Sequence, residues 1–229
     1  MKNLVLLHGA LGDARELDAV KQQLWAHYEV WVFPFSGHGG RTPDEPFSVN
    51  LFVRDLYFFI ERNHLERVYL FGYSLGGFIG VEFARRYPNL VERVFTFATK
   101  WNWTPEIASR ETKMLDPEKI KEKVPAFAQL LEKRHEEDWE KLVLYMADFM
   151  AELGNHPLPG NHWNKVTTPV CVAVGDQDKL VSVKETEQIS RQLQNGRLLV
   201  LPGTPHPFEK APHDELARLA VSFFQEDMP

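Results

Sequence analysis

Ser74 lies in the stretch whose pattern most favours chemistry, because residues 72–77 read Gly-Tyr-Ser-Leu-Gly-Gly. The run 67–71 before it is typical of a short buried strand, and the residues after it carry apolar side chains at helical spacing. A strand that turns directly into a helix strains the backbone of the turn residue. This requires almost no side chain two positions before and two after, and Gly72 and Gly76 satisfy the requirement. Such a turn lifts the Ser74 hydroxyl above the sheet and points the first helix amides at the group it attacks. We interpret Ser74 as a nucleophile, although a glycine-rich turn with an incidental serine is the better interpretation of this pattern outside a strand-to-helix context.

A serine hydroxyl attacks well only when a base takes its proton and a third group orients that base. Among the nine histidines, His206 follows the last predicted strand directly and lies between two prolines that stiffen its loop. Asp178 follows the preceding predicted strand, and Asp176 is a rival for the same role. The order Ser, Asp, His, each after a successive parallel strand, is typical of enzymes with a nucleophile elbow.

The elements that must position these residues follow from the apolar patterns. Short apolar runs predict strands at 4–7, 29–33, 67–71, 91–98, 169–174 and 197–201, with helices between most of them. Strands that alternate with helices of this length indicate an α/β fold, a mostly parallel sheet with helices on both faces. Ligands bind such sheets outside the carboxyl ends of the strands, where all the candidate residues emerge.

The alternation stops between the fourth and fifth predicted strands. Residues 104–163 show only helical patterns, and Thr104 and Asp116 stand before prolines that suit a first helical turn. We therefore expect a core formed by 1–103 and 164–229, with an inserted helical cap at 104–163, since a structureless loop of that length is improbable. The apolar stripe that begins at Trp139 has a simple structural interpretation, which is that it packs the cap onto the core.

On these motifs the sequence resembles the α/β-hydrolase superfamily, specifically a small capped member of its serine-nucleophile branch. The resemblance extends from His8 to the last helix and rests on five features: His8-Gly9, Gly37-His38-Gly39, the elbow at Ser74, Gly175-x-x-Asp178, and His206. It implies an α/β-hydrolase fold. The chain lacks the leading strand pair of many members, so we expect about six strands without the usual antiparallel neighbour.

The resemblance also implies roles for particular residues. It selects Asp178 over Asp176 as the acid, and it assigns the backbone N–H groups of Ala10 and Leu75 to an oxyanion hole. His8 is similar to the structural histidine of the family, and His38 is expected to tie down its loop by hydrogen bonds.

The implied reaction is hydrolysis of small to medium carboxylic esters through an acyl-enzyme on Ser74. Trp101 and Trp103 are candidates for the substrate pocket, with core packing as the alternative. The same three residues could instead serve lactone opening, thioester hydrolysis or carbon–carbon cleavage, and a ligand-binding member with slow turnover is a further alternative.

The composition limits the classes of partner that the protein can bind. The 229 residues carry a formal net charge of -6 and a sequence pI near 5.9, which argues against nucleic acid or an anionic membrane. No apolar run suits a signal peptide or a membrane span, so we expect a cytoplasmic protein acting on a small molecule, of undetermined oligomeric state. The single cysteine, Cys171, cannot form an internal disulfide. His156 and His162 are expected to be solvated, with a substrate contact as the alternative. No metal-ligand spacing is present, so neither metal nor cofactor is predicted.

Overall fold

A computed structural model describes residues 1–41 and 45–226 and contains one six-stranded sheet, in the order β2-β1-β3-β4-β5-β6. Every neighbouring pair is parallel, so the expected small sheet without an antiparallel strand is confirmed. The strands are β1 (Lys2–Leu7), β2 (Tyr28–Phe33), β3 (Val68–Tyr73), β4 (Val91–Phe97), β5 (Val170–Gly175) and β6 (Gly196–Leu201).

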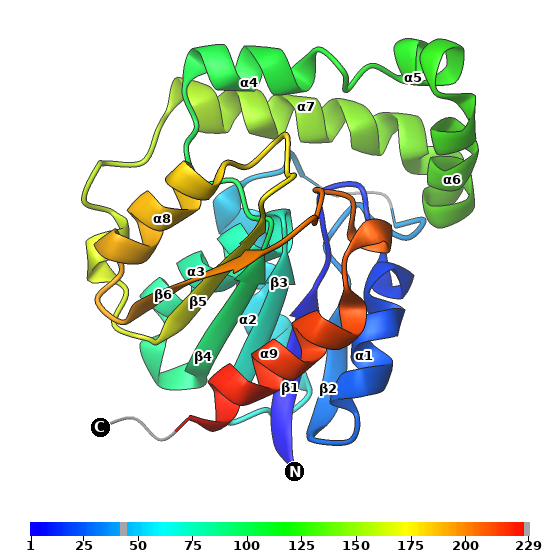
Figure 1. The fold of residues 1–229 in the computed structure, drawn as a ribbon. Helices are drawn as coiled ribbons and strands as arrows, with labels where there is room; N and C mark the ends of the chain where they lie inside the picture. Colours follow the sequence, from blue (N-terminus) through cyan, green and yellow to red (C-terminus); the bar gives the residue numbers. More distant parts are fainter. Residues whose placement is uncertain (42–44, 227–229) are drawn as a thin grey trace.

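Helices cover both faces of this sheet (Figure 1). On one face α1 (Asp18–Leu24) and α9 (His213–Gln225) pack with β-strand side chains in one apolar cluster. On the other face α2 (Val49–Arg62), α3 (Leu75–Arg86) and α8 (Val183–Gln192) contribute to a second and larger cluster. The two faces bury apolar side chains against one sheet, which is why its strands read as continuous apolar runs.

Local capping sets where several helices begin. The side chains of Ser48, Thr104 and Asp116 accept hydrogen bonds from backbone amides in the first turns of α2, α4 (Pro105–Thr112) and α5 (Pro117–Lys123). These bonds satisfy donors that have no partner inside the helix. Between β1 and β2, a 3-10 turn at Ala14–Leu17, capped by Asp13, precedes α1.

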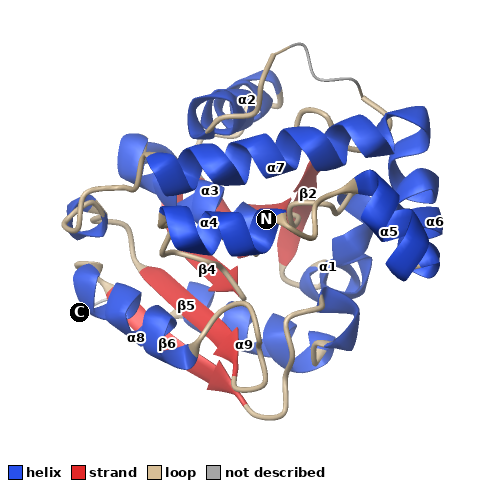
Figure 2. Ribbon diagram, turned by 90° about the horizontal axis from the view of Figure 1, so that it is seen from above, coloured by secondary structure: helices blue, strands red, loops and turns tan. Residues whose placement is uncertain are grey.

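The segment between β4 and β5 is helical, as its pattern predicts. It contains α4 (Pro105–Thr112), α5 (Pro117–Lys123), α6 (Pro125–His135) and α7 (Trp139–Asn155). These helices lie above the carboxyl ends of the strands, and α4 runs beside α7 (Figures 1 and 2). The apolar stripe of α7 contacts two clusters. Trp139 and Val143 join a small cluster with α5 and α6, whereas Met146 and Phe149 join the core of the sheet, so part of the stripe packs this segment onto the core.

The turn at Ser74 has the strained geometry expected of it. Ser74 has φ 50° and ψ −115°, in a region that side-chain-bearing residues seldom adopt. A Cβ on Gly72 would lie 2.5 Å from the backbone of Gly77, and one on Gly76 would lie 2.1 Å from the carbonyl oxygen of Leu7. Both glycines are therefore needed for α3 to start this close to β1 and β3.

The strand order reverses at β1, which has β2 on one side and β3 on the other. The register pairs Leu7 of β1 with Gly72 of β3, so the loop after β1 and the turn at Ser74 emerge together. A reversal of strand order leaves a crevice at the carboxyl ends, which is where α/β sheets bind ligands.

Candidate active site

Ser74, His206 and Asp178 meet at this edge of the sheet. His206 Nδ1 lies 2.8 Å from Asp178 Oδ2, and His206 Nε2 lies 3.5 Å from Ser74 Oγ. Donation from Nδ1 to the carboxylate leaves the lone pair of Nε2 directed toward the serine. The Ser74–His206 distance is long for a hydrogen bond and must shorten before a proton can pass, as is common in unliganded sites.

The structure also separates the two candidate acids. The Asp178 side chain is fully buried, and its Oδ1 accepts hydrogen bonds from the amides of Leu180 and Val181, each at 2.8 Å. Asp176 is exposed. The carboxylate that contacts His206 is therefore the one selected by the spacing after Gly175.

His206 is held from its other side by Tyr73, whose role the sequence pattern did not reveal. The Tyr73 hydroxyl donates to the carbonyl oxygen of His206 at 3.2 Å, and its ring packs against Phe208 with centroids 4.9 Å apart. Burial raises the pKa of the Tyr73 hydroxyl, so this group stays a hydrogen-bond donor. The elbow residue next to Ser74 thus anchors the loop that carries the candidate base.

The amides of Ala10 and Leu75 are available for a ligand. Within the described part of the chain, neither donates a hydrogen bond to another residue, and both residues line the same small cavity as Ser74. Glu16 fixes the start of the Ala10 loop, because its Oε2 accepts from the Gly9 amide at 2.8 Å. Two unpaired N–H groups beside a serine hydroxyl are the arrangement that stabilises an oxyanion.

The cavity at Ser74 is small and apolar. Its volume is about 40 Å³, and its lining residues come from both the sheet edge and α7: Ala10, Leu75, Phe78, Lys100, Trp103, Phe149, Met150 and Leu153. A second cavity of about 290 Å³ lies next to it and shares Phe78, Trp103 and Leu153 with it.

Comparison with known proteins identifies the family. Residues 4–219 match the model described as "Alpha/beta hydrolase family". The chain belongs to this family. A Haemophilus influenzae protein provisionally named an esterase/lipase is 22% identical to this hydrolase, and the match covers 98% of this chain and 83% of that protein.

Solved structures share the fold of this hydrolase. An alpha/beta hydrolase enzyme, MGS-M2, from a Medee basin deep-sea metagenome library superimposes with a TM-score of 0.84 at 15% identity, over 100% of this chain and 90% of that one. The enol-lactonase of Burkholderia xenovorans LB400 gives a TM-score of 0.82 at 17% identity, over 98% and 92% of the two chains. At these identities the likeness concerns the fold alone.

The two tryptophans proposed for the pocket of the hydrolase lie in different places. Trp103 borders both cavities. Trp101 borders only the larger one, is 4% exposed, and packs against Trp163 with ring centroids 5.2 Å apart. Of the two, only Trp103 faces the space next to Ser74.

Three histidines surround the loop that carries Ala10. His8 Nε2 accepts from the Phe35 amide at 3.3 Å, and His38 Nε2 lies 2.6 Å from the carbonyl oxygen of Ala10. Hydrogen bonds of His38 thus hold its loop, as expected. The sequence pattern did not reveal His135 of α6, whose Nδ1 accepts from the Gly39 amide at 3.0 Å and whose Nε2 lies 3.1 Å from the carbonyl oxygen of Leu11.

We expect the free energy of unfolding to fall on mild acidification because of these histidines. Burial lowers the pKa of His38 from 6.5 to about 4, and burial also lowers the pKa of His8 and His135. The unfolded chain therefore binds protons that the native state excludes as pH falls below 6.5. At 1.36 kcal/mol per pKa unit, His38 alone lowers stability by about 2 to 3 kcal/mol between pH 7 and pH 4.5.

Urea denaturation across this pH range measures the effect. Glu82 sets the lowest pH at which the effect of the histidines can be measured alone. Burial by itself would raise the pKa of Glu82, but hydrogen bonds from Arg85, His162 and Arg86 lower it to about 2. Its stabilising contribution is therefore lost only below about pH 4.5. His38→Gln is the control and should be less stable at pH 7 but show a shallower dependence on pH. A wild-type stability that is constant from pH 7 to pH 4.5 would contradict the prediction.

The remaining candidates are structural. The expectation that His162 is solvated is wrong, because its side chain is 12% exposed and its Nε2 lies 2.7 Å from Glu82 Oε2. His156 is exposed and pairs with Glu152. Burial raises the pKa of the Cys171 thiol to about 12, which leaves it unreactive.

Metal ligands and membrane-spanning helices are both missing from residues 1–41 and 45–226. No group of three or more His, Cys, Asp or Glu side chains in these ranges could hold a metal ion. None of their helices combines the length and the apolar character needed to cross a membrane.

Proposed function

We propose that this protein is a serine hydrolase that cleaves small to medium carboxylic esters through an acyl-enzyme on Ser74. The observation that carries the proposal is the contact series from Ser74 to His206 to Asp178, beside a cavity that is also lined by Ala10 and Leu75, whose amides donate to no residue of the described chain. These are the four components that acyl transfer requires: a nucleophile, a base, an orienting acid and an oxyanion hole.

In the first stage the Ser74 oxygen attacks the ester carbonyl carbon while His206 Nε2 takes its proton. The amides of Ala10 and Leu75 hold the oxyanion, and Asp178 stabilises the imidazolium and keeps its orientation. The oxyanion then collapses, the alkoxide leaves with the proton from His206, and the acyl group remains on Ser74.

In the second stage a water molecule replaces the alcohol. His206 Nε2 takes a proton from this water as its oxygen attacks the acyl carbon, and the same two amides hold the second oxyanion. Collapse of this intermediate returns the proton to Ser74 and releases the carboxylic acid. No cofactor enters the reaction.

The walls of the Ser74 cavity support a neutral substrate with a short acyl group. The space of about 40 Å³ is bounded mainly by apolar and aromatic side chains. We assign residues 104–163 to a cap, because Phe149, Met150 and Leu153 of α7 close the side of the cavity opposite the sheet. Trp103 forms part of the pocket wall. The Haemophilus influenzae relative is named an esterase/lipase, which agrees with this substrate class.

Mass spectrometry after exposure to a small fluorophosphonate tests the proposal without knowledge of the substrate. We expect one adduct on Ser74 in the wild-type protein and none in His206→Ala. A series of 4-nitrophenyl esters from acetyl to octanoyl should then show the highest kcat/KM for the short chains, and a lactone and a thioester measured alongside test whether the site prefers another acyl bond. A folded protein that forms no adduct and hydrolyses none of these compounds would favour slow-turnover ligand binding instead.

A further inference from the structure

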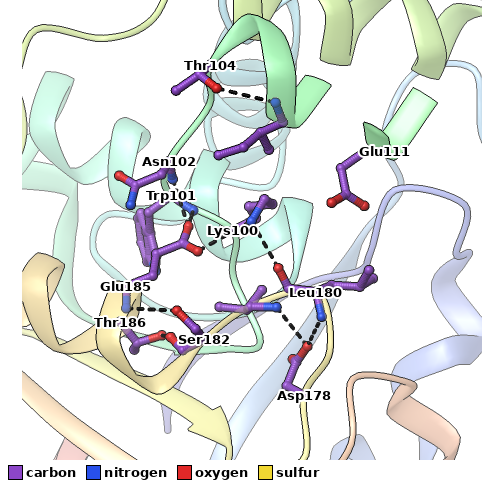
Figure 3. A network of polar contacts seen from close by, with 12 residues as sticks. Lys100, Trp101, Asn102, Thr104, Glu111, Asp178, Leu180, Ser182, Glu185 and Thr186 are labelled. Atoms are coloured by element: carbon purple, nitrogen blue, oxygen red, sulfur yellow. Dashed lines mark hydrogen bonds and ion pairs between the residues drawn. The ribbon is translucent and has the colours of Figure 1, made fainter. Parts of the chain in front are cut away.

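A network of polar contacts around the buried carboxylate of Glu185 lies beside the Ser74 cavity and joins two loops that are far apart in sequence (Figure 3). One loop follows β4 and carries Lys100 and Trp101, and the other follows β5 and carries Asp178 and Leu180. Glu185, in the first turn of α8, lies between them. The mechanism above uses only Asp178 from this network, so the function of the other members is unassigned.

Glu185 binds the loop that follows β4. Glu185 is 8% exposed. Its Oε1 accepts hydrogen bonds from the amides of Trp101 and Asn102, each at 2.8 Å. Its Oε2 lies 3.3 Å from Lys100 Nζ. Ser182 caps α8 by accepting from the Glu185 amide, and Ser182 and Glu185 have the spacing of a capping box. The Glu185 carboxylate contacts the neighbouring loop with both oxygens, and buried carboxylates are stable only with such charged and N–H partners.

Lys100 extends the network to the candidate acid. Its ammonium group also donates to the carbonyl oxygen of Leu180 at 2.9 Å. The amide of the same Leu180 donates to Asp178 Oδ1 at 2.8 Å. A continuous series of contacts therefore leads from Glu185 through Lys100 and Leu180 to Asp178, and from there to His206.

We propose that Lys100 and Glu185 are a positioning pair that holds the Asp178 loop and the loop after β4, which carries Trp103, in one fixed arrangement. The inference rests on the proposed function, since it assigns Asp178 the task of orienting His206. The charged groups of Lys100 and Glu185 bind neighbouring loops and do not contact Ser74 or His206. Lys100 lines the Ser74 cavity, and its ammonium is engaged by Leu180 and Glu185.

The backbone of Leu180 is held at two groups, because its carbonyl oxygen accepts from Lys100 and its amide donates to Asp178. Asp178 Oδ1 binds the amides of residues 180 and 181, so any movement of this backbone moves the carboxylate. Without the Lys100 ammonium, the Leu180 carbonyl loses its bond and Glu185 keeps a buried charge without its cation. Small displacements of an orienting group are costly in catalysis, since a shift of about 1 Å can reduce the rate about 100-fold.

Lys100→Met removes the ammonium and keeps an unbranched apolar side chain of similar length beside the cavity. We expect the rate of Ser74 labelling by a fluorophosphonate, and kcat for a short aryl ester, to fall about tenfold to 100-fold, with little change in KM. The downfield proton NMR resonance of the His206 Nδ1–H bonded to Asp178 should weaken or broaden. Lys100→Arg keeps a cation with several N–H donors, so it should restore most of the labelling rate and most of the His206 resonance.

The double variant Lys100→Met with Glu185→Gln tests whether the two residues act as one unit. The glutamine side chain keeps an oxygen for the Trp101 and Asn102 amides but carries no charge, so the double variant should be no slower than Lys100→Met alone. Glu82→Gln is the matched control, because it removes another buried carboxylate with several N–H donors, away from the Asp178 loop. It should lower stability and leave both the labelling rate and the resonance unchanged.

The outcomes separate this inference from the proposed function. If the folded Lys100→Met protein labels at the wild-type rate and keeps the His206 resonance, the pair has no positioning role. If Glu82→Gln loses labelling and resonance to the same extent, the effect is general destabilisation and the inference also fails. If the wild-type protein itself is not labelled, the proposed function fails, whereas the NMR comparison still decides whether Lys100 holds the bond between Asp178 and His206.

Discussion

Replacing Ser74 by alanine is expected to lower kcat for a short aryl ester by about 10⁵-fold or more, because the removed oxygen is the atom that forms the acyl-enzyme. His206→Ala should be nearly as severe, since it removes the imidazole that lies next to the Ser74 hydroxyl and takes its proton. The double variant should be no worse than either single one, because residues that act as a unit have strongly non-additive effects.

Steady-state kinetics and urea denaturation should be measured together for these variants. Ser74 and His206 are both partly exposed and neither belongs to the apolar core, so each variant should keep the wild-type fold and a similar free energy of unfolding. Ser222→Ala, on the exposed face of α9, is the control for a loss of hydroxyl that leaves activity unchanged. Unfolding of Ser74→Ala or His206→Ala would show that these residues serve the structure instead of the reaction.

Asp178→Asn is expected to lower kcat by about 10⁴-fold, which is the size of the effect when the orienting acid of a serine triad loses its charge. An asparagine oxygen can still accept from the amides of Leu180 and Val181, so its NH₂ group then faces His206 Nδ1. This arrangement favours the tautomer with the proton on Nε2, and the imidazole can no longer accept the proton of Ser74.

Asp176→Asn is the matched control for this substitution, because it makes the same chemical change two residues away on an exposed side chain. We expect it to change kcat by less than about twofold, since an exposed group without contact to His206 has little influence on it. A greater loss from Asp176→Asn than from Asp178→Asn would reverse the assignment of the acid.

Much of the fold follows from interactions between residues close together in the chain. Apolar periodicity depends on which side chains repeat every second or every third to fourth position, and it predicted all six strands and their alternation with helices. Capping depends on one side chain and the amides two or three residues later, and Thr104 and Asp116 begin helices as predicted. The strained turn at Ser74 also requires two nearby glycines.

Periodicity and capping patterns do not predict contacts between loops that are distant in sequence. The carboxylate of Glu185 has the spacing of a local capping box, yet both of its oxygens bind residues more than 80 positions earlier. His135 and Tyr73 likewise act on loops far away in sequence. The expectation for His162 was wrong for the same reason, since its partner Glu82 lies 80 positions away.

By itself the sequence determined the α/β alternation, the strained turn at Ser74 and the positions of Asp178 and His206 after successive strands, because these depend on local patterns and on one topological rule. Only the tertiary structure decided how wide the cavity is, which tryptophan faces Ser74, and how Lys100 and Glu185 join the loops beside it. Those features depend on where α7 and α8 pack relative to the sheet edge, and no short-range periodicity encodes the packing of side chains from separate elements.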